Sequence, residues 1–395
     1  MLRRDGPLWL AVFLDLCGFA MVLVDIQFRA QSFGAVGWQI GLIQASTFIV
    51  QVLLSPMWGR LSDRVGRKSV FVACTCLSSL SFLCYAFAPS LWILLLSRVI
   101  GGFGAANVAI AQAATADAYS GAERTMALGR LSAALTTGLI VGPVLGGFLA
   151  EAFNSQLIGL VGAGLSLVGA SLVLIFSRMA PGSFEPEKSS FSFFPLARKH
   201  PELSPLLVAG GVAWFSLAML EGTFGRLIQR TLGLGQSEFG LIFGFESIIG
   251  VLVQAVLLGF ILKFVRERKA LVIALVLQGA GLAASPFAPE FAWLFVASGV
   301  YAIGNSLANP MISSLCSRQV PESSQGELFG VIQSARSVGF IFGPILGGAV
   351  FDWQPYAPYI IAGVVSVVAA GLVLGSKQGV GVNVDRESNA PVVDS

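Results

Sequence analysis

An all-α protein that crosses a membrane many times is the fold class that this sequence predicts. The 395 residues are 55% hydrophobic and only 11% charged, with a mean hydropathy of +0.81. Soluble domains carry about 25% charged residues, so this chain cannot cover a water-facing surface. Apolar runs near the ~20 residues that a helix needs to cross a bilayer recur along the whole chain.

A glycine–proline pattern that occurs twice predicts that the chain has two similar halves. The first copy is Gly129, Gly138, Gly142, Pro143, Gly146 and Gly147. Each residue has a counterpart 201 positions later, in Gly330, Gly339, Gly343, Pro344, Gly347 and Gly348. Such a repeat at one fixed offset is typical of transporters built from duplicated units.

Apolar runs separated by polar breaks predict twelve spans. They cover residues 8–28, 38–58, 69–88, 91–116, 125–150, 156–177, 204–224, 237–262, 270–288, 291–316, 327–350 and 356–375. The longest polar stretch falls at the midpoint. We therefore expect an N-terminal six-helix bundle (1–177), a cytoplasmic linker (178–203), a C-terminal six-helix bundle (204–375) and a disordered cytoplasmic tail (376–395).

Positive charge predicts the orientation in the membrane. Lysine and arginine gather in alternate loops, whereas the opposite set of loops carries only Arg29, Arg226 and Arg230. The positive-inside rule then places both termini in the cytoplasm, in what we expect to be a bacterial inner (plasma) membrane. Basic loops next to a lipid bilayer need no nucleic-acid partner. The first apolar run ends without a small-residue cleavage site, so we expect it to stay as the first span.

The stretch from Gly59 to Lys68, between the second and third spans, reads Gly-Arg-Leu-Ser-Asp-Arg-Val-Gly-Arg-Lys. A glycine at each end predicts a tight turn, and Asp63 can cap a helix or pair with an arginine. The stretch resembles the signature loop of the major facilitator superfamily. The resemblance implies the major facilitator fold and a gating network that locks the halves in an outward-open state. Its members here would be Gly59, Asp63, Arg64, Gly66, Arg67, Lys68 and Asp117. A loop that only sets topology is the simpler interpretation.

The fourth and fifth spans extend the resemblance. Arg98 lies in an apolar span, where a charge is costly and normally faces a partner or a wet cavity. It resembles the fourth-helix arginine that this superfamily links with proton coupling. The pattern around Pro143 resembles the antiporter motif of drug:proton exporters, similar to tetracycline efflux proteins. Its glycines allow close helix approach, and its proline removes a backbone hydrogen bond. Close packing without a transport role is the alternative.

The candidate carboxylates within predicted spans are, in our order of preference, Asp15, Glu246, Asp25 and Glu221. Intramembrane acids are functional candidates by default. Desolvation disfavours their charged form, so they can exchange protons near neutral pH. Asp15 resembles the first-helix aspartate of tetracycline-type and vesicular-amine exporters. For Asp25 and Glu221, contact with headgroups or nearby arginines is an equal alternative.

Polar side chains also share helical faces. Gln44 with Gln51, Glu246 with Gln254, and Asn305 with Asn309 are spaced to lie on one side of a helix. They could line a cavity, although helix–helix hydrogen bonding is the ordinary explanation. Trp214 lies mid-span, where packing is favoured over substrate stacking.

Together these features predict a proton-coupled antiporter that exports amphipathic small molecules or drugs by rocker-switch alternating access. We expect a monomer without cofactors or metal, and not an enzyme, because no paired catalytic constellation occurs. A symporter or facilitator for a metabolite is the first alternative, and a non-transporting receptor or sensor is the second.

Overall fold

The computed structural model describes residues 2–177, 203–320 and 325–376. Helices make up nearly all of these residues, and no strand occurs among them. Twelve helical segments are long and apolar enough to cross a membrane, and each overlaps one predicted span. The twelve-span prediction is therefore confirmed. The predicted linker apart from Leu203, and the predicted tail from residue 377, lie outside the described residues.

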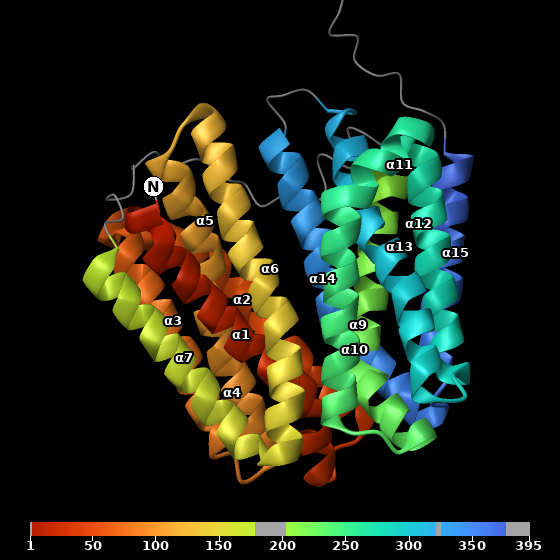
Figure 1. Cartoon of the computed structure of the whole chain (residues 1–395), viewed down its shortest axis with the longest axis horizontal. Helices are drawn as coiled ribbons and strands as arrows, with labels where there is room; N and C mark the ends of the chain where they lie inside the picture. Colours follow the sequence, from red (N-terminus) through yellow and green to blue (C-terminus); the bar gives the residue numbers. More distant parts are fainter. Residues whose placement is uncertain (1, 178–202, 321–324, 377–395) are drawn as a thin grey trace, which may run out of the picture.

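Two bundles of helices stand side by side in Figure 1. The first contains α1 (Leu2–Ser32), α2 (Gly37–Val65), α3 (Arg67–Ala86), α4 (Leu91–Gly104), α5 (Asn107–Ala118), α6 (Gly121–Ala152) and α7 (Ser155–Phe176). The second contains α9 (Ser204–Leu232), α10 (Gln236–Leu252), the π-helical η2 (Val253–Leu257), α11 (Leu258–Phe264), α12 (Glu267–Ala284), the 3₁₀ turn η3 (Ser285–Phe287), α13 (Phe291–Ser317), α14 (Gln325–Trp353) and α15 (Ala357–Gly375).

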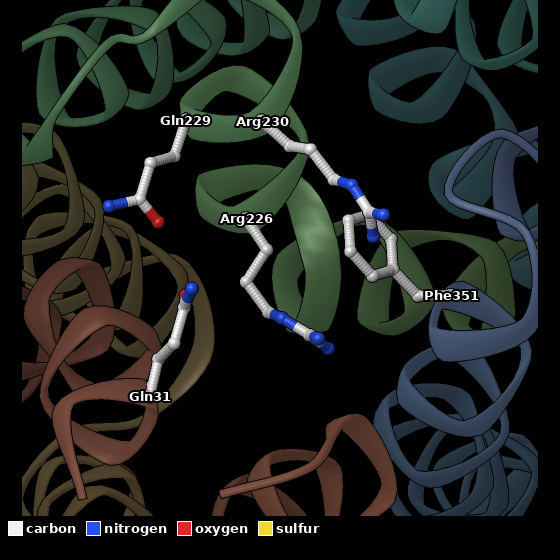
Figure 2. Close-up of a pocket in the computed structure, with 5 residues that line it drawn as sticks. All are labelled: Gln31, Arg226, Gln229, Arg230 and Phe351. Carbon is white, nitrogen blue, oxygen red and sulfur yellow. The ribbon is translucent and has the colours of Figure 1, made fainter. Parts of the chain in front are cut away.

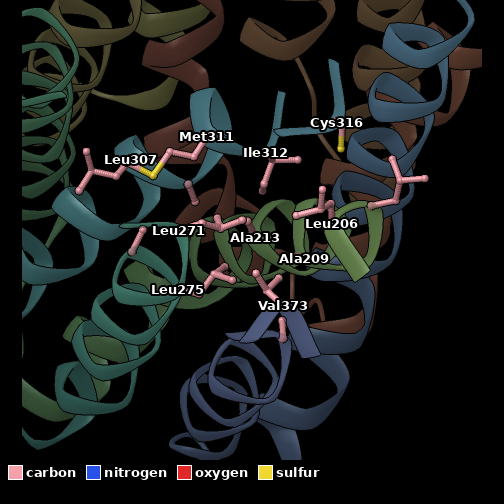
Figure 3. Close-up of a cluster of buried hydrophobic side chains, with 14 of the residues drawn as sticks. Leu206, Ala209, Ala213, Leu271, Leu275, Leu307, Met311, Ile312, Cys316 and Val373 are labelled. Carbon is pink, nitrogen blue, oxygen red and sulfur yellow. The ribbon is translucent and has the colours of Figure 1, made fainter. Parts of the chain in front are cut away.

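Small residues let the helices of each bundle approach closely. In the second bundle, Ala209 and Ala213 of α9 are fully buried beside Leu271, Leu275 and Val373 (Figure 3). Lipid tails are as apolar as these side chains, so close van der Waals packing and buried hydrogen bonds must hold the bundle together.

We call the end of the molecule that holds the N-terminus and the last residues of α15 the terminal end, and the opposite end the far end (Figure 1). The predicted loop between the second and third spans lies at the terminal end. The prediction of a turn at Gly59 is wrong, because α2 continues through Gly59 to Val65. The helix ends instead at Gly66, whose φ of 104° favours glycine.

Candidate functional site

One contact between the bundles, which we call the first seal, runs along one face of α2. At the far end, Gly37 donates its backbone N–H to Oδ2 of Asp352 on α14, at 2.5 Å. One turn further on, a Cβ added to Gly41 would overlap the backbone carbonyl of Pro344. The absence of side chains at these two positions lets the main chains of opposite bundles touch.

The same face continues to the middle of the molecule. Nε2 of Gln44 donates to the backbone carbonyl of Glu221 on α9, at 3.5 Å. The ring of Phe48 then stacks on Phe340 of α14, with centroids 4.5 Å apart. Among the described residues, the hydrogen bonds, ion pairs and ring contacts that join the bundles all lie between the far end and this stack.

A second contact between the bundles, the second seal, has the same form, but here the glycine belongs to the second bundle and the proline to the first. A Cβ added to Gly240 of α10 would overlap the carbonyl of Pro143 on α6. Ser237 donates its hydroxyl to the carbonyl of Gly147, at 3.4 Å. The two copies of the glycine–proline motif therefore occupy equivalent places in the two seals.

The motif glycines divide by the side that they face. Gly138, Gly142 and Gly146 pack on α1, and Gly339, Gly343 and Gly347 pack on α9. Gly147 and Gly348 face the opposite bundle, whereas a Cβ on Gly129 or Gly330 would meet nothing within 4 Å.

Toward the terminal end the bundles separate. Residues 51–60 of α2 include no buried position, unlike most of residues 40–47.

Asp15 is buried inside the first bundle. Its carboxylate accepts hydrogen bonds from Ser166 of α7 and Asn107 of α5, both at 2.6 Å, and from Ser78 of α3 at 3.4 Å. All of these donors belong to the bundle that contains Asp15.

Asp25 and Arg98 are joined through Tyr85 of α3. The Tyr85 hydroxyl donates to Asp25 in a short hydrogen bond. The guanidinium groups of Arg29 and Arg98 lie 4.5 and 5.5 Å from the Tyr85 ring centroid. Nε of Arg98 is buried and has no hydrogen-bond partner among the described residues. Asp25 is fully buried in the protein, so its side chain does not contact lipid headgroups.

Glu221 and Glu246 are the acids of the second bundle. Their carboxylates lie within electrostatic reach of each other, and Ser298 of α13 lies beside Glu246. Among the described residues, buried Oε1 of Glu246 and the neighbouring hydroxyl of Tyr301 have no hydrogen-bond partner. This cluster is thus less completely paired than Asp15.

An aromatic platform lies beside these acids. The Arg336 guanidinium, within electrostatic reach of Glu221, lies 4.2 Å from the centroid of the Trp214 ring. Trp214 in turn contacts Phe340, with ring centroids 5.5 Å apart. The platform, the acids and the stack on Phe48 together form the candidate site.

The other predicted cavity residues are dispersed. Gln51 donates to the carbonyl of Ala105 within the first bundle, at the break between α4 and α5. Asn309 lines a small cavity beside Trp214 and donates to the Asn305 carbonyl at 3.4 Å. Gln254 is exposed in η2, and no described hydrogen bond links it with Glu246.

In the loop at the terminal end, Arg67 is the centre of the charge network. It pairs with Asp63 at 2.7 Å and with Asp117 at 3.1 Å, so these ion pairs stay within the first bundle. The second bundle has an ion pair at the equivalent place with its charges reversed. Arg318, 201 positions after Asp117, pairs with Glu267 at 2.6 Å.

A cavity of about 320 Å³ lies at the far end. Figure 2 shows Arg226, Gln229 and Arg230 of α9 around it, with Gln31 of α1 opposite. Arg226 also pairs with Asp352 at 2.6 Å, and thus supports the carboxylate that holds Gly37.

The Major Facilitator Superfamily model matches residues 8–250 and 206–390, which together cover most of the chain. The chain belongs to this superfamily. Multidrug resistance protein 2 of Bacillus subtilis is 28% identical over 375 residues, 93% of each chain. Quinolone resistance protein NorA of Staphylococcus aureus is 27% identical over 390 residues, 96% of this chain and 97% of NorA. The nucleoside transporter NupG shares the fold, with a TM-score of 0.75 at 16% identity over 94% of this chain and 98% of NupG. The predicted transporter fold is therefore confirmed.

Several residues of the site were missed by the sequence analysis. The sequence alone assigned no role to Gln27, Tyr85, Tyr301, Arg336 and Asp352. Polar residues within apolar spans were the available signal for most of them. Their partners could not be found, because the partners come from other helices.

Proposed function

We propose that this superfamily member is a proton-coupled antiporter that exports amphipathic small molecules by rocker-switch alternating access. The terminal end faces the cytoplasm in this proposal, in agreement with the positive-inside rule. The protein acts as a monomer in the bacterial plasma membrane. The names of the relatives, which are multidrug and quinolone resistance proteins, support export of drugs.

The observation that supports the proposal best is the one-sided closure of the bundles. They touch from the far end to the stack of Phe48 on Phe340, and separate toward the terminal end. An inward-open state of an alternating-access transporter has this arrangement. The acids and the aromatic platform lie at the inner edge of the seal, where a molecule entering from the cytoplasm would meet them.

We assign the substrate site to Trp214, Phe340, Glu221 and Glu246. Aromatic faces favour a flat, lipophilic cation, and so does the buried Glu246 oxygen that has no hydrogen-bond partner among the described residues. Burying a charged carboxylate without a partner is costly, so either a proton or a cationic substrate relieves the cost. Competition between the two at one carboxylate produces exchange. Glu246 suits this role better than Asp15, whose oxygens already accept three hydrogen bonds within one bundle.

Proteoliposomes loaded with a fluorescent lipophilic cation such as ethidium test this function. A pH gradient should drive ethidium movement opposite to proton movement, and Glu246→Gln should lower the rate at least about tenfold, as loss of a residue that acts in every cycle does. Glu151→Gln, at an exposed position of α6, is the matched control. Ethidium movement in the same direction as protons would indicate a symporter instead.

A further inference from the structure

We infer that Gln27 and Gln44 are positioning residues that clasp the backbone of Glu221 only while the far end is closed. This inference rests on the proposed function. It assigns to the two amides a link between the gate and Glu221, the carboxylate that neighbours Glu246 in the proposed substrate site.

Both glutamines reach across the bundle boundary to one atom. Nε2 of Gln27 on α1 donates to the backbone carbonyl of Glu221 in a short hydrogen bond, and Nε2 of Gln44 on α2 lies 3.5 Å from the same oxygen. Gln27 is fully buried and Gln44 is 6% exposed. Two buried amides from different helices of one bundle thus converge on a single turn of the other bundle.

Glycines on α9 make this approach possible. A Cβ added to Gly225 would lie 2.8 Å from Cε2 of Phe28 and 3.2 Å from Oε1 of Gln27. A Cβ added to Gly222 would lie 3.2 Å from Oε1 of Gln44. The turn that carries Glu221 therefore presents bare backbone to both amides. A side chain at Gly222 or Gly225 would crowd this contact between the bundles, where Pro344 and Phe28 also lie within 3 Å of the added Cβ.

The clasp contributes only a small net free energy to the closed state. Oε1 of Gln27 and Oε1 of Gln44 are buried without a hydrogen-bond partner among the described residues. An unsatisfied buried acceptor offsets much of what the donated hydrogen bond contributes. The far-closed state is thus favoured only modestly, as a switching element requires.

The clasp also connects the gate with the charge on Glu221. The clasped carbonyl and the carboxylate belong to the same residue, so a shift of this helical turn moves both. When the bundles part at the far end, the amides must leave the carbonyl, and the surroundings of the carboxylate change in the same step. Glu221 is within electrostatic reach of both Glu246 and Arg336. Binding of a proton or a cation at the two acids and closure of the far end therefore bias each other reciprocally.

Spin-label distances across the far end test the clasp. Ser32→Cys and Gln354→Cys place labels at exposed positions of opposite bundles, in a background in which the five native cysteines are replaced. Gln27→Met and Gln44→Met keep the side-chain length and remove the amide. In nanodiscs we expect each to raise the ratio of far-open to far-closed molecules about three- to tenfold, the value of one net hydrogen bond. Gly225→Ala should act in the same direction.

Gln278→Met is the matched control. Gln278 is also fully buried, has an unpartnered Oε1 among the described residues, and donates to the Ala213 carbonyl of α9 at 3.0 Å, but within its own bundle. It should leave the far-end ratio unchanged.

The pH dependence of the variants distinguishes a positioning role of the two glutamines from a role in packing alone. In the glutamine variants, the pH dependence of both the distance ratio and ethidium exchange should flatten. Unchanged ratios, or altered ratios with an unaltered pH profile, would overturn the clasp while leaving the proposed function intact. Absence of pH-driven exchange in the parental protein would overturn the proposed function, and the clasp with it.

Discussion

Asp15 illustrates how surroundings decide the role of a buried acid. Three donors from α3, α5 and α7 converge on its carboxylate, so it links helices of one bundle. Glu246, by contrast, has a buried oxygen without a partner among the described residues. Two acids that look equivalent in the sequence thus differ in how completely their charge is compensated.

Asp15→Asn should therefore act mainly on stability. Asparagine keeps one acceptor oxygen for three donors, so Ser166 or Asn107 must change its hydrogen-bond partner or orientation, which costs about 1 kcal/mol. We expect a lower midpoint of thermal unfolding in detergent, with pH-driven exchange retained in the folded fraction. An unchanged midpoint together with lost exchange would return the coupling role to Asp15.

At the scale of helices, hydropathy and charge predicted all twelve spans, because the apolar length of a span is a local property of the chain. The rotation of each helix about its axis is not local. The sequence could not show that Asp25 faces Tyr85, or that Gln27 faces α9, since other helices decide these contacts. The turn expected at Gly59 failed for a related reason: a glycine permits a turn but does not impose one.

Bulky residues in the glycine seal should prevent closure of the far end. Gly41→Leu or Gly240→Leu would force side chains into the backbone carbonyls of Pro344 or Pro143. We expect exchange to fall to about a tenth of the parental rate or less, with more far-open molecules in the spin-label measurement. Gly330→Ala is the control, because its Cβ meets nothing within 4 Å. Full exchange in the leucine variants would show that closure does not need these contacts.

At the scale of the whole molecule, the two bundles are similar in backbone and different in charge. Asp117 and Arg318 stand at equivalent positions with opposite signs, and each has found a partner of the opposite charge. A latch at the far end also joins the two bundles. It consists of Arg226 and Asp352 of the second bundle, which hold Gly37 of the first.

Asp352→Asn should weaken this latch. A neutral amide pairs less strongly with Arg226 and is a poorer acceptor for the N-terminus of α2, where a negative charge is favoured. The far-open fraction should rise about two- to fivefold, the equivalent of about 0.3–1 kcal/mol. Spin labels across the far end measure it, with Asp5→Asn, at the opposite end, as the control. No change in that fraction would show that the Asp352 charge does not hold the far end closed.

Both glycine seals are formed by main-chain atoms, Gly41 against the Pro344 carbonyl and Gly240 against the Pro143 carbonyl. A peptide group is the same whatever residues surround it. Mutations that reshape the pocket around Trp214 therefore need not disturb these main-chain contacts. A lineage of such proteins can change the compounds that it removes from the cell without rebuilding the gate that moves them.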